Sequence, residues 1–325
     1  MHEKKPIKLI SGTANKKLAE EISSYLDIPL MPVKIKRFND GEIYCKIEES
    51  VRGSEVFLIQ PTSPQVNENL MELLVLVDAV KRASSREITA VIPYYGYARQ
   101  DRKTEPREPI SAKLVANLLT KAGIDRVVAF DLHVDQIQGF FDIPFDNLEA
   151  LPLVAEHLLD KNLKDIVVVA PDAGGTKRAR RLAKLIEAPL AVIDKRRPAH
   201  GEAKVMNIIG EVKGKTAVLV DDIIDTAGTI SKAAVAVLEK GAEEVYICAT
   251  HPVLSGKAIE RLSSDKINGI VVTNTIDVPS EKRLEKIKII SIAPILAESI
   301  KTIYEGMPMG VVFEGIQNRL AKKRK

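Results

Sequence analysis

The stretch "AVLVDDIIDTAGTIS", residues 217–231, decides the fold. An apolar run ends at two adjacent aspartates, Asp221 and Asp222, and a turn of small and hydroxyl residues then leads into a helical pattern. This order is typical of α/β proteins, whose ligands gather at the carboxyl ends of the strands. Two buried neighbouring carboxylates repel each other and lose hydration. The pair therefore predicts either exposure to water or a partner that carries hydroxyls or a metal ion.

On both sides of this stretch, short apolar segments alternate with amphipathic ones. Strand character marks residues 7–11, 56–60, 88–95, 126–132, 165–172, 190–195, 216–222, 244–250 and 269–274. Helical character marks, among others, residues 67–84, 110–123 and 229–241. The alternation predicts an α/β fold with mainly parallel sheets flanked by helices.

Length and an internal repeat predict two domains. A chain of 325 residues exceeds what a single core usually holds. Residues 111–133 and 231–251 each run from a helix through a Gly and a strand to a His, which aligns His133 with His251. In this alignment, residues 93–109 of the first half correspond to residues 220–229 of the second. We expect tandem domains of one fold, followed by a C-terminal segment that packs back on the N-terminal domain, with boundaries at 1–147, 148–303 and 304–325.

Composition indicates an ordinary globular protein. Apolar residues make up 45% and charged residues 28% of the chain. The sequence shows no long apolar run and no secretory signal, and Cys45 and Cys248 are too few for a disulfide framework. The net charge of +4 and the absence of Trp argue against a nucleic-acid partner. We expect a cytoplasmic protein with neither nucleic acid nor a membrane as partner.

The turn after the aspartate pair has the chemistry of a phosphate site. Backbone N–H groups and hydroxyls at a helix start attract phosphate, and the residues concerned are Asp225, Thr226, Ala227, Gly228 and Thr229. Asp221 and Asp222 can accept hydrogen bonds from adjacent ribose hydroxyls, directly or through a divalent cation. A phosphate at one end and a diol at the other describe a pentose 5-phosphate. The alternative is a plain helix cap beside two solvated acids.

The same stretch resembles the phosphoribosyl-binding signature shared by type I phosphoribosyltransferases and ribose-phosphate pyrophosphokinases. Six further segments resemble the pyrophosphokinases in particular, and in their order: "FNDGE" (38–42), "YARQDRK" (97–103), "REPISAKLVANLL" (107–119), "DLHVDQIQGFF" (131–141), "APDAGGTKRAR" (170–180) and "DKRRP" (194–198). The chain is thus similar to class I type ribose-phosphate pyrophosphokinases over essentially its whole length. The resemblance implies two type I phosphoribosyltransferase-like domains.

The implied activity is transfer of the diphosphoryl group of ATP to the 1-hydroxyl of ribose 5-phosphate, for nucleotide biosynthesis. "GEVKGKT" (210–216) is no nucleotide-binding P-loop, because it is one residue short and precedes its strand. Read alone, "NDG" is a turn and "RQDRK" a solvated loop. The resemblance instead assigns ATP binding to Phe38, Asp40, Gly41, Glu42, Arg99 and Gln100.

The resemblance also supplies the metal and the catalytic residues. It implies Mg²⁺ bound by His133 and Asp172, each of which ends a strand, while His251 is expected to be structural. Lys195 and Arg197 are the implied catalytic pair, because phosphoryl-type transfer needs cations where charge spreads in the transition state. Without the resemblance, "DKRRP" is a solvated charge run.

Assembly and regulation follow from the resemblance alone. It implies a homo-oligomer of dimers that form a hexamer, inhibition by ADP, and activation by inorganic phosphate near Ser50 and Arg52. Two rival functions stay open at this point. One is a phosphoribosyltransferase, and the other is a catalytically silent regulatory homologue.

Overall fold

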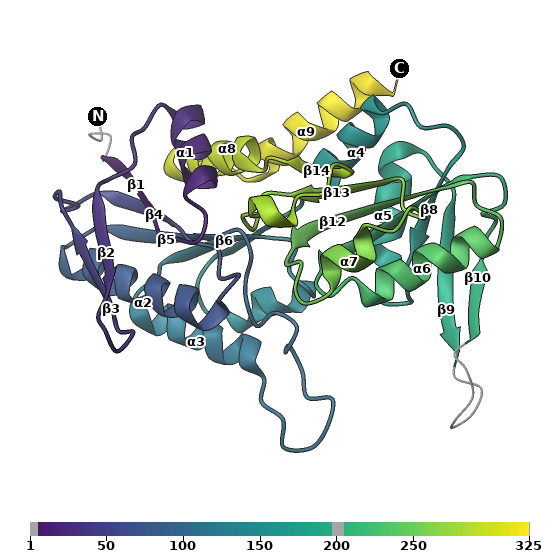
Figure 1. Cartoon of the computed structure of the whole chain (residues 1–325). Coiled ribbons are helices and arrows are strands. Elements are labelled where there is room, and N and C mark those ends of the chain that lie inside the picture. Colours follow the sequence, from purple (N-terminus) through teal and green to yellow (C-terminus); the bar gives the residue numbers. More distant parts are fainter. Residues whose placement is uncertain (1–5, 197–204, 325) are drawn as a thin grey trace. The chain divides into compact units, whose positions relative to one another are not determined.

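The computed structural model describes residues 6–196 and 205–324 (Figure 1). The chain divides into two compact units. The first comprises Met1–Glu149, Thr275–Asp277 and Ser291–Val312, and the second comprises Ala150–Asn274, Val278–Ile290 and Phe313–Lys325. Within the described ranges, no helix is both long and apolar enough to cross a membrane.

The first unit is built on a five-stranded parallel sheet. Its order is β1 (Ile7–Ser11), β4 (Glu55–Ile59), β5 (Glu87–Ile92), β6 (Arg126–Phe130) and β7 (Phe145–Leu148). Its helices are α1 (Lys16–Leu26), α2 (Val66–Arg82), α3 (Ser111–Ala122), the short 3-10 helix η1 (Asp135–Phe140) and α8 (Ala293–Tyr304). The inner strands are almost wholly buried, as expected where helices cover both faces of a sheet.

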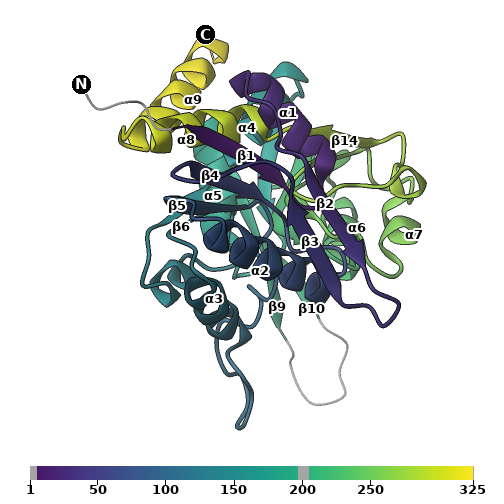
Figure 2. The same ribbon diagram turned by 90° about the vertical axis from the view of Figure 1, so that its left-hand side faces the viewer.

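A separate antiparallel hairpin belongs to the first unit. It consists of β2 (Val33–Arg37) and β3 (Ile43–Ile47). Strand β3 packs against α2, and Figure 2 shows the hairpin beside that helix. These two strands were not predicted from the sequence; each is only five residues long, and three of the five residues of β2 are charged.

The second unit contains a seven-stranded sheet. Its order is β10 (Val205–Ile209), β9 (Leu190–Arg196), β8 (Ile166–Ala170), β11 (Thr216–Ile224), β12 (Glu244–Pro252), β13 (Gly269–Thr273) and β14 (Ile287–Ile290). Only β10 runs antiparallel to its neighbour among these described strands. The helices are α4 (Leu151–Asp160), α5 (Thr176–Ile186), α6 (Gly228–Glu239), α7 (Ala258–Leu262) and η2 (Ser280–Lys282), while α9 (Gly310–Lys323) begins in the first unit and ends in the second. The predicted α/β class with mainly parallel sheets is confirmed.

Strand β11 continues past the end of one of its neighbours. It pairs with β8 only as far as Leu219, but with β12 as far as Ile224. Asp221 and Asp222 therefore lie inside a two-stranded extension of the sheet, where the β8 side of β11 has no strand beside it. The aspartate pair was expected at the end of the strand and is found within it.

Sheet order corrects the alignment of the two halves. Counting from the first strand of each unit, β1-β4-β5-β6-β7 corresponds to β8-β11-β12-β13-β14. Leu30 also bridges to Leu9 on the outer side of β1, as β9 pairs outside β8. Strand β11 thus corresponds to β4, and α6 to α2. The sequence alignment had paired them with β5 and α3, which is wrong by one strand–helix unit, so His133 and His251 are not equivalent. Successive strand–helix units have similar patterns of apolar residues, so the pattern alone does not tell which unit of one half corresponds to which unit of the other.

The C-terminal part divides differently from the expected boundaries at 303 and 304. Helix α8 belongs to the first unit because it packs on α1, and Ser291 donates a hydrogen bond to Glu21. The end of the chain belongs to the second unit, where Lys323 forms ion pairs with Glu156 and Asp160.

Candidate functional site

The turn between β11 and α6 is held from outside by the segment that follows β12. The Leu254 N–H donates to the Ile224 carbonyl at 2.9 Å, and the Ser255 N–H donates to the Asp225 carbonyl at 3.0 Å. The Ser255 hydroxyl also donates to the Asp225 carboxylate. Ala227 has a positive φ of 58° just before α6 begins at Gly228. The first N–H groups of a helix have no partner within it, so this preformed turn offers donors to an anion.

The aspartate pair lies beside Arg178 of α5, with Asp222 buried and Asp221 partly buried. Asp222 is 5% exposed, and the Asp222 N–H donates to the Asp221 carboxylate at 2.9 Å. On α5, Nη1 of Arg178 lies 3.1 Å from Oδ1 of Asp222 and 3.7 Å from Oδ1 of Asp221. Burial, followed by the hydrogen bond and the charge of Asp222, raises the pKa of Asp221, and Arg178 opposes this shift. The two carboxylates thus favour a further cation or hydroxyl donor.

Asp172 lies in the β8–α5 turn of the same unit. Its carboxylate accepts a hydrogen bond from the Gly175 N–H at 3.1 Å. A Cβ at Gly174 would lie 3.3 Å from the same carboxylate, a close contact that glycine avoids. Since β8 and β11 are parallel neighbours, Asp172, which follows β8, and the aspartate pair, in the extension of β11, both lie toward the carboxyl-end edge of the sheet. The Asp172 carboxylate caps the turn that leads into α5.

His133 belongs to the first unit, where it is exposed and follows β6. It and Asp172 thus lie in different units, and each is described only within its own. The described part of the chain contains no group of three or more His, Cys, Asp and Glu side chains able to hold a metal ion. His251, by contrast, is 3% exposed inside β12 and pairs with Ile223, in keeping with the structural part expected for it.

The tip of the β2–β3 hairpin presents an aromatic ring to solvent. Phe38 is 57% exposed, and its ring centroid lies 6.1 Å from that of Tyr44 in an edge-on contact. The Asp40 carboxylate accepts the Glu42 N–H at 3.1 Å, and Gly41 has a φ of 98°, which favours glycine. The tip is therefore a defined turn with one face of Phe38 available for stacking.

Arg99 and Gln100, both exposed, lie in the loop before α3. The Gln100 side-chain oxygen accepts a hydrogen bond from the Ser111 hydroxyl at 2.6 Å, and the Gln100 carbonyl accepts the Ala112 N–H at 3.1 Å. Gln100 therefore caps the start of α3. Both segments contact the first turn of α2. Arg37, next to the hairpin tip, pairs with Glu68, and the Tyr97 hydroxyl, two residues before Arg99, donates to the Asn67 side-chain oxygen.

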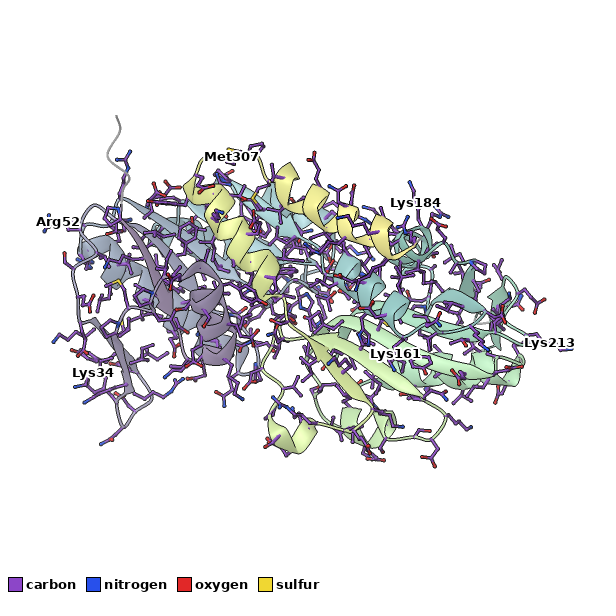
Figure 3. The ribbon with its side chains drawn as sticks, turned by 90° about the horizontal axis from the view of Figure 1, so that it is seen from above. Lys34, Arg52, Lys161, Lys184, Lys213 and Met307 are labelled. Atoms are coloured by element: carbon purple, nitrogen blue, oxygen red, sulfur yellow. The ribbon has the colours of Figure 1, made fainter. Side chains whose placement is uncertain are left out.

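Two pairs of expected residues remain to be placed. Lys195 lies in β9 opposite Met206, and only its backbone is described, while Arg197 lies outside the described residues. Ser50 and Arg52 are exposed in the loop before β4, where the Arg52 N–H donates to the Ser50 hydroxyl at 3.3 Å. Figure 3 shows Arg52 at the outer surface.

Comparisons with known proteins decide the family. A model of the N-terminal domain of ribose phosphate pyrophosphokinase matches residues 7–123, and one of the phosphoribosyl synthetase-associated domain matches residues 197–314. Over 308 residues the chain is 58% identical to the ribose-phosphate pyrophosphokinase of Bacillus caldolyticus, covering 95% of this chain and 98% of that protein. The chain belongs to the ribose-phosphate pyrophosphokinase family.

Two other relatives agree. The ribose-phosphate pyrophosphokinase of Bacillus subtilis (strain 168) is 55% identical over 309 residues, covering 95% of this chain and 98% of the relative. The crystal structure of phosphoribosylpyrophosphate synthetase from Mycobacterium smegmatis superposes with a TM-score of 0.89 at 43% identity, covering 93% and 100% of the two chains. The family expected from the sequence motifs is confirmed, and so is the fold.

Arg178 is the site residue that sequence reasoning did not single out. It lies in the segment "TKRARR" of α5, where four of the six residues are Lys or Arg, so residue type alone does not distinguish Arg178 from its neighbours. The spacing of residues along the helix could have identified Arg178. Arg178 comes four residues before buried Leu182, so it shares the inward face of the helix.

Proposed function

We propose that this transferase moves the diphosphoryl group of ATP to the 1-hydroxyl of ribose 5-phosphate, yielding 5-phosphoribosyl 1-diphosphate and AMP. The observation that carries the proposal is the β11–α6 turn with its adjacent aspartates and Arg178, in a chain whose family membership spans its length.

The second unit holds the pentose. The backbone N–H groups and hydroxyls of residues 225–229 bind the 5-phosphate, and Asp221 and Asp222 accept the ribose hydroxyls. Hydrogen bonds donated by the ribose hydroxyls would stabilise the charged form of Asp221, which burial disfavours by raising its pKa. Bound ribose thus relieves the repulsion within the pair.

The donor set fits a magnesium ion. Carboxylate oxygens are its preferred protein ligands, and it usually keeps most of its shell for phosphate and water, so one or two side chains suffice. Asp172 and His133 would hold it, and Asp221 with Asp222 offer further oxygens. When bound, the ion neutralises charge on the triphosphate.

The nucleotide side belongs to the first unit. Phe38 stacks on the adenine, Asp40 and Glu42 accept hydrogen bonds from it, and Arg99 and Gln100 bind base or phosphate. We propose that the ATP site lies near a boundary between two chains of an oligomer. Dimers that assemble to a hexamer contain such a boundary, with ADP and phosphate as effectors near Ser50 and Arg52.

The chemistry is an in-line displacement at the β-phosphorus. The 1-hydroxyl of the pentose attacks, the bond to the α-phosphate oxygen breaks, and AMP leaves without a covalent enzyme intermediate. Lys195 and Arg197 stabilise the charge that spreads over the transferring group.

Product analysis tests the proposal against its rivals. Purified protein is incubated with ATP, Mg²⁺ and ribose 5-phosphate, and the products are identified by ³¹P NMR. We expect AMP and 5-phosphoribosyl 1-diphosphate in equal amounts. A phosphoribosyltransferase would instead consume the 1-diphosphate together with a base, and a silent homologue would bind ATP without releasing AMP.

A further inference from the structure

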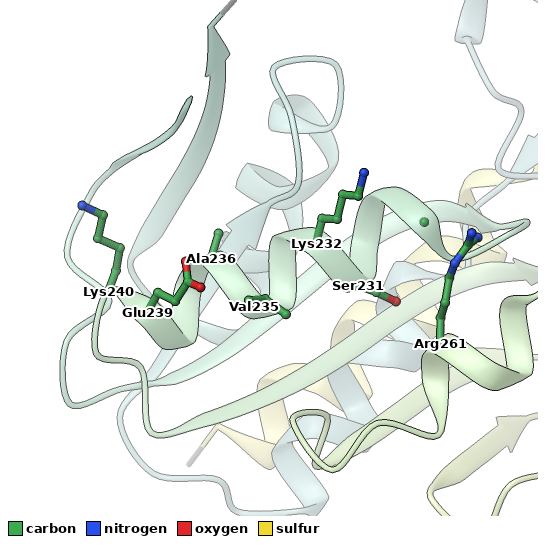
Figure 4. A pocket seen from close by; sticks show the side chains of 8 residues that line it. Ser231, Lys232, Val235, Ala236, Glu239, Lys240 and Arg261 are labelled. Atoms are coloured by element: carbon green, nitrogen blue, oxygen red, sulfur yellow. The ribbon is translucent and has the colours of Figure 1, made fainter. Parts of the chain in front are cut away.

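Arg261, on the short helix α7, contacts the turn between β11 and α6, to which we have assigned the 5-phosphate. Its Nη1 donates a hydrogen bond to the Thr226 carbonyl at 2.6 Å. The same nitrogen would lie 3.4 Å from a Cβ added to Gly228, so the guanidinium packs against the start of α6. Figure 4 shows the Arg261 side chain extending toward the first turn of α6.

The hydrogen bond fixes the orientation of one peptide unit in the turn. In a planar trans peptide the C=O and N–H groups point in opposite directions. The Thr226 carbonyl points toward Arg261, so the N–H of Ala227 in that same unit points away from it. A flip of this unit would reverse both groups, and the positive φ of Ala227 shows that the backbone has an unusual conformation there.

Two anchors therefore hold the turn, one at each end. Leu254 and Ser255 fix Ile224 and Asp225 through backbone hydrogen bonds, and Arg261 fixes the peptide that follows Thr226. All three residues come from the segment after β12. Only the Arg261 anchor is a side chain that carries charge, and its positive charge adds to the attraction of the helix start for an anion.

We propose that Arg261 is a positioning residue for ribose 5-phosphate. It keeps the Ala227 N–H directed at the 5-phosphate without touching the substrate itself. This inference rests on the proposed role of the turn. Arg261 is exposed and lines a pocket of about 570 Å³ along α6, together with Ser231, Lys232 and Val235 among others, so replacing it leaves the core intact.

The test compares three variants of the full-length enzyme. Arg261→Met removes the donor while keeping a long side chain, and Arg261→Lys keeps one donor and the charge. Lys257→Ala is the matched control, because Lys257 is an exposed cation at the start of the same helix, where it pairs with Glu260 at 4.0 Å. Initial rates are measured with ribose 5-phosphate and ATP varied in turn, and thermal melting checks folding.

We expect Arg261→Met to raise KM for ribose 5-phosphate about tenfold, as for loss of one charged hydrogen bond, with KM for ATP changed less than about twofold. Arg261→Lys restores most of the effect, and Lys257→Ala matches the wild type. Equal weakening for both substrates, or an unchanged KM for ribose 5-phosphate in Arg261→Met, overturns the inference while leaving the proposed function intact. A folded wild-type enzyme that binds no ribose 5-phosphate overturns both.

Discussion

Arg178 donates a hydrogen bond to the Asp222 carboxylate at 3.1 Å, and this contact ties the first turn of α5 to the extension of β11. It places a cation beside two neighbouring carboxylates, of which Asp222 is buried and Asp221 is partly buried. Burial, with the hydrogen bond and the charge of Asp222, raises the pKa of Asp221, so a ligand with hydroxyl groups or a cation would stabilise its charged form.

Replacing Arg178 removes a cation that lies close to both carboxylates of the pair. We expect Arg178→Leu to lower the free energy of unfolding by about 2 kcal/mol, because a buried carboxylate loses its charged partner. We also expect kcat/KM for ribose 5-phosphate to fall at least tenfold, roughly the value of one charged hydrogen bond. Urea unfolding and steady-state kinetics measure the two effects. Arg180→Leu, at an exposed position of the same helix, is the control, and equal effects of the two changes would refute the assignment.

The raised pKa of Asp221 predicts that replacing this carboxylate makes the fold more stable at higher pH but lowers activity. A carboxyl whose pKa is higher in the folded than in the unfolded chain stabilises the fold fully only below its ordinary value of 3.8, and this stability is lost as the pH rises through the raised pKa. Asp221→Asn removes that pH dependence. Its melting temperature should therefore gain on that of the wild type as the pH rises from acid to mildly alkaline.

The same variant should lose activity, by about 10- to 100-fold in kcat/KM for ribose 5-phosphate, since a neutral amide accepts hydrogen bonds less strongly than a carboxylate. Asp265→Asn, at an exposed position of the second unit, makes the same charge change as a control. A melting difference that stays constant with pH would argue against the burial of this charge.

Phe38 predicts a nucleotide-specific defect. Phe38→Ala should raise KM for ATP about tenfold, because stacking of an aromatic ring on a base contributes about 1–3 kcal/mol. KM for ribose 5-phosphate and the melting temperature should stay at wild-type values, since the ring is exposed. Tyr25→Ala removes another exposed aromatic ring of the first unit as a control. A Phe38→Ala enzyme with normal KM for ATP would remove the hairpin tip from the ATP site.

In the first unit, a buried side chain occupies the sheet edge that corresponds to the proposed ribose 5-phosphate site of the second unit. Glu72 of α2, 1% exposed, accepts hydrogen bonds from the Thr13 N–H at 2.6 Å and from Gln60 at 2.9 Å, beyond the ends of β1 and β4. Glu72→Leu takes the carboxylate acceptor away from the buried Gln60 side chain and should lower the free energy of unfolding by about 3 kcal/mol. Glu68, one turn earlier, forms an exposed ion pair with Arg37, so Glu68→Gln should cost under about 1 kcal/mol. Urea unfolding that shows equal losses would contradict this network.

Local pattern predicted the buried strands and their parallel order, because continuous apolar runs between helices have few other arrangements. It did not predict the hairpin of β2 and β3, whose strands are five residues long and, in β2, carry three charges. It also set the repeat one unit out of register. Only hydrogen bonding between strands distinguishes β4 from β5 as the counterpart of β11. Similarly, the packing of α8 on α1 joins segments far apart in the sequence.

The candidate site shows the same limit. Asp221, Asp222 and the turn after them were identified from the motif, because residue type and strand position together specify their chemistry. Arg178 contacts the Asp222 carboxylate, and Arg261 contacts the turn before α6. The chain contains many Lys and Arg residues, and the sequence alone does not distinguish these two from the others. Their contacts depend on how α5 and α7 pack on the sheet.

A crystal structure of the enzyme with ribose 5-phosphate tests the central claim most directly. We predict the 5-phosphate at the N–H groups of residues 225–229 and the ribose hydroxyls within hydrogen-bonding distance of Asp221 and Asp222. Density for the sugar phosphate elsewhere on the chain, with this turn and the aspartate pair binding only water, would contradict the account.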